Sequence, residues 1–221
     1  MNETRSWARS SLAEKLADEK ERFRTNADPA YVQAFEDFIY TLKISGIEAG
    51  ALKENDRAPD FALKNALRRS VILAEALKAG PAILAWYRGG WCPYCNLALH
   101  ELQRFLPEFK QAKASLMALS PELPDKSLST KEKLALEFEV LTDTDNAVAK
   151  KYGGVHILSS EVRDYYNSLK VFEYYPSEFY DFPVPATYIV DSNFIVRYAF
   201  VDPDFRNRAE PTEILRVLNN L

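Results

Sequence analysis

The chain has 221 residues, of which 47% are hydrophobic and 27% charged, which is typical of a soluble globular protein. Its net charge of −4 and isoelectric point of about 5.4 leave no electrostatic case for binding nucleic acid. No apolar run is long enough for a transmembrane helix, and the first residues lack the apolar core of a signal peptide, so we expect a cytoplasmic protein without a membrane partner.

The first 48 residues predict a hairpin of two helices. A charged segment over residues 6–25 carries a sparse apolar stripe at helical spacing. A second helix is expected to begin at Asp28, which precedes a proline, and to end before Gly46. We therefore predict an N-terminal helical extension over residues 1–48 and one domain over residues 49–221. The extension could pack on that domain or on a second subunit.

From residue 58 onward, short apolar runs that predict strands alternate with amphipathic runs that predict helices. This alternation predicts an α/β sheet with parallel strands. Strands are expected at residues 58–63 and 70–73, which would form a hairpin, and at 81–87, 116–119 and 140–141. Helices are expected at residues 74–78, 93–109 with a bend at Pro107, 126–139 and 145–152.

Residues 155–183 interrupt the alternation and are rich in aromatic side chains. These rings could cover the edge of the core, or some could line a surface for a substrate or partner beside the cysteines. Strands over residues 186–190 and 194–200 then predict a second hairpin, and residues 211–221 predict the closing helix.

Two cysteines, Cys92 and Cys95, lie where the strand over residues 81–87 gives way to a helix, and the sequence contains no others. Pro93 suits the first helical position, so Cys92 would cap the helix, with its sulfur near free N–H groups and the positive end of the helix dipole. We expect this to lower its pKa below about 8.5 and to make Cys92 the more acidic thiol. Cys95 lies within reach for a disulfide, and Arg88 would add positive potential. The pattern predicts a redox-active pair.

Two other interpretations of the cysteines are weaker. A metal site would need more soft ligands, and the chain offers only His100 and His156, neither of which is close to the pair along the helix. Two inert buried cysteines rarely fall in this pattern. We therefore expect no metal, and no organic cofactor, because the sulfur chemistry itself carries the electrons.

A strand, Trp-Cys-x-x-Cys, a helix, and later a proline directly before a β-hairpin resemble the plan of the thioredoxin fold, a mixed sheet flanked by helices. With the flanking residues 58–61, 80–81, 87–95 and 120–122, the chain resembles the peroxiredoxin-like branch of the alkyl hydroperoxide reductase/thiol-specific antioxidant family. The resemblance covers roughly residues 50–220. It implies that Pro185 is a cis proline facing the cysteines. Residues that it places at the substrate are Trp91, Tyr94, Val184 and Pro185.

The chain departs from that family at two places. Peroxiredoxins carry Pro-x-x-x-Thr/Ser-x-x-Cys in this loop, and the alignment places their reactive cysteine on Cys95, their hydroxyl residue on Cys92 and their proline on Arg88. They also carry a peroxide-binding arginine just before a later strand, where this chain has Pro185. Arg88 would therefore have to take the role of that arginine.

Three functions follow as hypotheses. In the first, a thiolate reduces hydrogen peroxide or an organic hydroperoxide, a Cys92–Cys95 disulfide forms, and a thioredoxin- or glutathione-type thiol reduces it. In the second, Cys92 attacks a protein or glutathione disulfide and Cys95 resolves the mixed disulfide. In the third, the fold is a redox-responsive interaction module without catalysis. A homodimer is possible in each case, and the resemblance favours the peroxidase.

Overall fold

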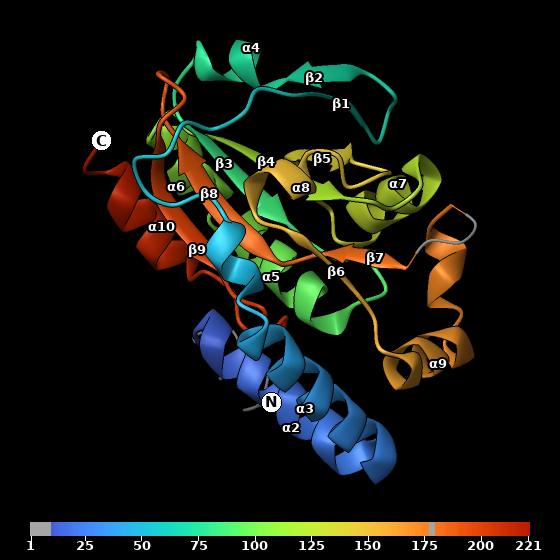
Figure 1. Ribbon diagram of the computed structural model, residues 1–221. Helices are drawn as coiled ribbons and strands as arrows, with labels where there is room; N and C mark the ends of the chain where they lie inside the picture. Colours follow the sequence, from blue (N-terminus) through green and yellow to red (C-terminus); the bar gives the residue numbers. More distant parts are fainter. Residues whose placement is uncertain (1–9, 177–179) are drawn as a thin grey trace, which may run out of the picture.

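The computed structural model describes residues 10–176 and 180–221. Its centre is a seven-stranded mixed sheet of order β2-β1-β5-β4-β3-β8-β9 with helices on both faces (Figure 1). The strands are β1 (Ala62–Asn65), β2 (Ser70–Ile72), β3 (Ala82–Trp86), β4 (Ser115–Ser120), β5 (Glu139–Thr142), β8 (Ala186–Val190) and β9 (Val196–Val201). β3, β4 and β5 run parallel, whereas β1–β2 and β8–β9 are antiparallel hairpins. The predicted parallel strands and both predicted hairpins are confirmed.

Except for the helix within residues 155–183, which was not predicted, the helices lie close to the predicted positions. They are α2 (Leu12–Asn26), α3 (Pro29–Ile44), α4 (Leu73–Leu77), α5 (Pro93–Arg104), α6 (Leu106–Gln111), α7 (Pro124–Lys133), α8 (Ala149–Tyr152), α9 (Ser160–Ser168) and α10 (Pro211–Leu218), with 3₁₀ turns η1 (Ile47–Gly50) and η2 (Val171–Tyr174). The bend expected at Pro107 is a break between α5 and α6 at Phe105. Two helices are shorter than predicted, because Ala135 and Asn146 adopt positive φ angles. Within the described residues, no helix has the length and apolar character needed to cross a bilayer.

Side chains of β3 alternate between two buried layers, as the strand period of two requires. Ile83 and Ala85 face the layer that contains α5, α6 and α10. Leu84 and Trp86 face the opposite layer, which contains α4 and α8. Because every residue of β3 is buried, the loop that follows it begins deep inside the molecule. The cysteines lie in this loop and at the start of α5.

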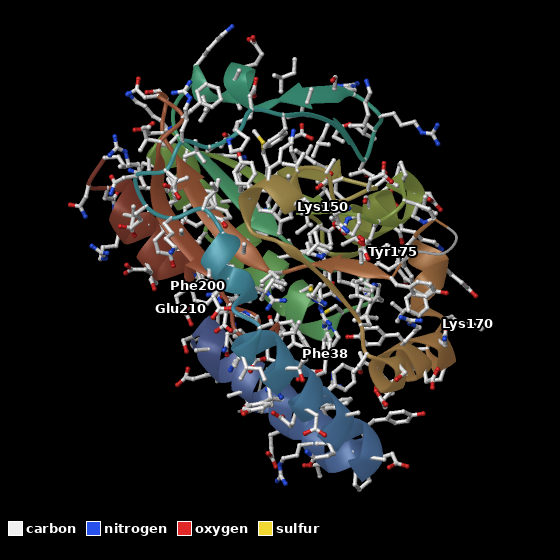
Figure 2. All side chains as sticks on the ribbon, in the orientation of Figure 1. Phe38, Lys150, Lys170, Tyr175, Phe200 and Glu210 are labelled. Carbon is white, nitrogen blue, oxygen red and sulfur yellow. The ribbon has the colours of Figure 1, made fainter. Side chains whose placement is uncertain are left out.

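The N-terminal hairpin packs against the cysteine helix of its own chain (Figure 1). Lys15 of α2 and Glu101 of α5 form a buried ion pair with a distance of 2.7 Å from Nζ to Oε1. Glu210, labelled near the start of α2 in Figure 2, accepts hydrogen bonds from the Leu12 and Ala13 amides there. Arg206 also pairs with Glu36 of α3. The hairpin is therefore held to the rest of the chain at the first turn of α2 and at Glu36 of α3.

Lys15→Met is expected to lower the free energy of unfolding by about 1–2 kcal/mol, because it removes one cation from a buried pair. The loss is smaller than for an isolated pair, because Arg104 still donates to Glu101 at 2.8 Å. Urea denaturation followed by circular dichroism measures it. Lys78→Met, which breaks an exposed ion pair with Glu75, is the matched control and should change the stability by less than about 0.5 kcal/mol.

The aromatic-rich segment folds as β6 (Val155–Ile157), α9, η2 and β7 (Asp181–Pro183), with β6 and β7 paired antiparallel, and its residues 177–179 lie outside the described residues. Tyr165 packs edge-on against Phe23 and Phe35 of the N-terminal hairpin. Tyr166 and Tyr175 contact the cysteine loop instead. Some of the rings thus cover the core, and others lie buried beside the cysteine loop.

Candidate active site

Cys92 is the cap of α5, as predicted. Its backbone is extended (φ −84°, ψ 117°), and its Sγ accepts a hydrogen bond of 3.4 Å from the Cys95 amide. The loop before it must pass close to α7: a Cβ added to Gly90 would overlap Thr130 Oγ1. Glycine at position 90 therefore allows the loop to bring Cys92 to the helix start.

The two sulfurs are free thiols and fully buried. Arg88 Nη2 donates to Cys92 Sγ at 3.0 Å. Cys95 Sγ accepts from the Arg88 amide at 3.4 Å and from Arg208 Nη2 at 3.4 Å. Each sulfur therefore lies beside one guanidinium group, and both predicted cysteines and Arg88 come together. Arg208 was not predicted.

The pKa values of the two thiols shift in opposite directions. Burial raises the pKa of Cys92 well above its usual range, and its hydrogen bond with Cys95 adds to the shift. Burial alone would raise the pKa of Cys95 as well, but the hydrogen bond from Cys92 and the charges of Arg208 and Arg88 lower it well below the usual range. The structure thus favours Cys95 as the more acidic thiol, whereas the sequence predicted Cys92. A single amide at the helix cap does not offset its desolvation, and the positive charges favour an anion at Cys95.

Arg88 is a buried cation in an aromatic environment. Its guanidinium lies 3.7 Å from the Phe205 ring and 5.1 Å from the Trp91 ring, and Nη1 donates to the Tyr166 hydroxyl at 2.5 Å. Among the described residues, no carboxylate lies within ion-pair distance of it. The Tyr175 hydroxyl, labelled in Figure 2, donates to the Arg88 carbonyl at 2.6 Å. A thiolate is thus the nearest available counter-charge.

Glu122 holds the cysteine loop through hydrogen bonds and was not predicted as a site residue. It is fully buried, and it accepts hydrogen bonds from the Gly90 amide at 2.8 Å and the Tyr87 hydroxyl at 3.0 Å. Burial raises the pKa of its carboxyl to about 7. In the sequence, only its place in a flanking motif distinguished it.

Glu122→Gln is expected to flatten the dependence of stability on pH. Because folding raises the pKa of Glu122 from 4.5 to about 7, the folded state binds the proton more tightly. This contribution is fully present below the unfolded value of 4.5 and is lost as the pH rises through about 7. The wild type should lose on the order of 1–3 kcal/mol between about pH 5 and pH 8 through this group. Urea denaturation across this range tests it. A wild type and variant with the same slope would contradict it.

The prediction that Pro185 is a cis proline is wrong. No peptide bond in the described residues is cis, so the bond before Pro185 is trans. Val184 and Pro185 are buried in a two-residue connection that carries the chain from β7 directly into β8, and an extended trans bond suits that path. The residue of this region that shares a cavity with Cys95 is Thr187.

Among the described residues, one cavity adjoins Cys95 and another adjoins Arg88. One, of about 20 Å³, lies beside Cys95 and is also lined by Arg208, Thr187 and Leu12. The other, of about 100 Å³, is lined by Arg88, Trp91 and Tyr94 together with aromatic residues of α2, α3 and α9. The predicted residues Trp91 and Tyr94 therefore line a cavity. No group of three or more His, Cys, Asp or Glu residues that could hold a metal is found in residues 10–176 and 180–221.

A thioredoxin-like mixed sheet with a buried dithiol at the start of a helix defines a class of thiol-dependent redox proteins. The sequence model of the AhpC/TSA family matches residues 55–199. The chain therefore belongs to the AhpC/TSA family, as the sequence predicted. The N-terminal hairpin and Arg208 lie outside the matched residues.

The chain is similar to several relatives. It is 34% identical over 103 residues to a bcp protein of Buchnera aphidicola, covering 46% of this chain and 64% of that protein. It is 28% identical to peroxiredoxin Bcp of Escherichia coli (46% and 65%) and 25% identical to the chloroplastic peroxiredoxin Q of Oryza sativa subsp. japonica (79% and 70%). The match thus spans slightly less than two thirds of the bacterial relatives.

Solved structures agree on the fold. The crystal structure of peroxidoxin BcpB from Mycobacterium tuberculosis has a TM-score of 0.61 at 18% identity, covering 77% of this chain and 98% of that one. A peroxiredoxin-like protein from Aquifex aeolicus has a TM-score of 0.60 at 15% identity, covering 77% and 88%. The predicted thioredoxin-like fold is confirmed.

Proposed function

We propose that the protein is a thiol peroxidase in which Cys95 attacks the peroxide and Cys92 resolves the product. The Cys95 thiolate attacks one peroxide oxygen, the O–O bond breaks, and water or an alcohol leaves with a proton, which gives a sulfenic acid on Cys95. The Cys92 sulfur then displaces the hydroxyl as water, and a disulfide forms. Two thiols of an external reductant restore the dithiol.

The observation that carries this proposal is the position of Cys95. Its Sγ lies 3.4 Å from Arg208 Nη2, its pKa is lowered, and it lines a cavity of about 20 Å³. About 10–15 Å³ accommodates one water molecule, so this cavity suits the two oxygens of a peroxide better than a bulky substituent. Arg208 lines the same cavity as Cys95, so we assign to Arg208 the polarisation of a bound peroxide. From the sequence alone this role was assigned to Arg88.

Dithiol exchange is the second candidate, because the two thiols lie together at the start of α5, where Cys92 Sγ accepts a hydrogen bond from the Cys95 amide at 3.4 Å. Their complete burial favours a small oxidant over a protein disulfide. We further propose a low-molecular-weight thiol rather than a thioredoxin-type protein as the reductant, because both sulfurs are fully buried. We also propose a reducing compartment such as the cytoplasm, and a homodimer as the assembly to be tested.

Stopped-flow kinetics of the reduced protein distinguish these candidates. We expect hydrogen peroxide to oxidise the protein at least about a hundredfold faster than it oxidises free cysteine at neutral pH, because a thiolate beside a guanidinium is the reacting species. A rate equal to that of free cysteine, together with rapid reduction of glutathione disulfide, would favour exchange. If the protein carried out neither reaction, the third hypothesis, a redox-responsive interaction module without catalysis, would be favoured.

A further inference from the structure

The larger cavity lies where three parts of the chain meet. Phe23 of α2 and Phe35 of α3 come from the N-terminal hairpin, Tyr165 and Tyr166 come from α9, and Trp91 comes from the cysteine loop. Figure 1 shows α9 beside the end of the hairpin, and the ring centroids of Tyr165 and Phe35 are 5.4 Å apart. The cavity has about 100 Å³ of space with aromatic walls, and it is suited to a small apolar group.

Its buried polar feature is Arg88, whereas Glu36 and Arg206, which also line the cavity, form an ion pair with each other. The Arg88 guanidinium is 1% exposed and lines the cavity, and its Nε has no hydrogen-bond partner among the described residues. Buried unpaired donors of a cation favour an anion. Arg88 Nη2 is also 3.0 Å from Cys92 Sγ, and Trp91, Pro93 and Tyr94, which flank Cys92 in the sequence, line the same cavity. An anion bound at Arg88 would therefore lie near Cys92 rather than near the cavity at Cys95.

Oxidation changes the charge at this place. In the reduced protein a thiolate of the pair balances Arg88, and in the disulfide neither sulfur carries a charge. The oxidised form thus holds a buried guanidinium that has lost its counter-charge, next to the sulfur that a reductant must attack. The thiolate of a reductant supplies the missing charge.

We propose that this aromatic cavity is the reductant site, that it takes a small thiolate with an apolar body, and that it directs this thiolate to Cys92. The inference rests on the disulfide of the proposed function. The thiolate attacks Cys92 Sγ, the S–S bond breaks, and Cys95 takes the electron pair and leaves as a thiolate beside Arg208. A second thiolate then attacks the mixed disulfide, releases the oxidised reductant and leaves Cys92 as a thiolate, which takes up a proton.

The direction of attack agrees with the acidity of the pair. In thiol–disulfide exchange the thiol with the lower pKa leaves faster, and that thiol is Cys95. Peroxide and reductant then reach the pair from two sides, the peroxide at Cys95 and the reductant at Cys92. Phe23 and Phe35 lie outside the residues that match the family, so the reductant preference is a property that the hairpin adds.

The test uses the full chain oxidised with diamide, so that it needs no peroxidase activity. Reduction by benzyl mercaptan and by 2-mercaptoethanol, thiols of similar acidity that differ in their apolar body, is followed by Trp fluorescence. We compare the ratio of the benzyl mercaptan rate to the 2-mercaptoethanol rate. For the protein this ratio should be about tenfold or more higher than for oxidised dithiothreitol, because the benzyl ring is buried in the cavity. Leu169 lines the cavity and is 56% exposed, so Leu169→Trp should fold and narrow it.

Leu169→Trp should remove most of the preference, lowering the ratio of the benzyl mercaptan rate to the 2-mercaptoethanol rate toward the ratio seen with oxidised dithiothreitol. Ile44→Trp, at an exposed position of α3 outside the cavity, should change neither rate. With one equivalent of benzyl mercaptan and an acid quench, mass spectrometry should find the adduct on Cys92. Equal rates for the two thiols, no effect of Leu169→Trp, or an adduct on Cys95 would overturn the inference. A failed peroxide reaction in the separate stopped-flow assay would overturn the proposed function alone, whereas failure to form the disulfide would overturn both.

Discussion

Cys95→Ser is expected to lower the second-order rate of peroxide reduction by about three orders of magnitude or more, because it removes the nucleophile. Cys95 is the thiol of low pKa, and it faces the small cavity with Arg208. The remaining thiol, Cys92, has its pKa raised by burial and is therefore mostly protonated at neutral pH. Stopped-flow oxidation by hydrogen peroxide, followed by Trp fluorescence, measures the loss.

The matched control is Cys92→Ser, which keeps a hydroxyl donor beside Cys95. It should retain a first oxidation within about tenfold of the wild-type rate and then stop at the sulfenic acid, which dimedone traps. Turnover with a reductant should be lost in this variant. If Cys92→Ser abolished the first oxidation and Cys95→Ser did not, the roles assigned to the two cysteines would have to be exchanged.

Arg208→Met should slow peroxide reduction at neutral pH by about ten- to a hundredfold, because a charge-assisted hydrogen bond to the reacting thiolate contributes about 1.5–3 kcal/mol. Arg208 Nη2 lies 3.4 Å from Cys95 Sγ. Its charge also lowers the pKa of Cys95, so the pH at which the rate reaches half of its plateau should move upward. A high pH should therefore recover part of the lost rate. The measurement is the rate of oxidation as a function of pH.

Arg216→Met is the control for Arg208→Met, since Arg216 is an exposed arginine of α10 that pairs with Glu213. It should leave the rate and its pH profile unchanged. An Arg208→Met protein with the wild-type pH profile would show that Arg208 does not stabilise the thiolate.

The parts of the site that the sequence predicted are local. The buried strand, the glycines, Pro93 and the cysteine spacing together determine that Cys92 caps α5, and Arg88 lies only four residues before it. Likewise the two hairpins and the parallel strands follow from apolar runs of strand length separated by turn residues. These features depend on neighbours along the chain, and the sequence displays such neighbours directly.

The parts that were missed depend on contacts between distant residues. Arg208 is 113 residues from Cys95 in the sequence, and no local pattern indicates that the segment before α10 returns to the cysteine helix. Glu122 became a loop support only through its burial beneath Gly90. The sequence predicted the other order of acidity for the same reason. The helix cap was visible in the sequence, but neither the desolvation of Cys92 nor the second guanidinium at Cys95 was.

The most direct test of the account is an NMR titration of the wild-type protein with labelled cysteine Cβ atoms, which reports the ionisation of each thiol without a mutation. The account predicts that the Cys95 resonance shifts at a pH well below the usual thiol range, while the Cys92 resonance shifts well above it. Ionisation of Cys92 first, or of both thiols in the ordinary range, would contradict the assignment of Cys95 as the nucleophile.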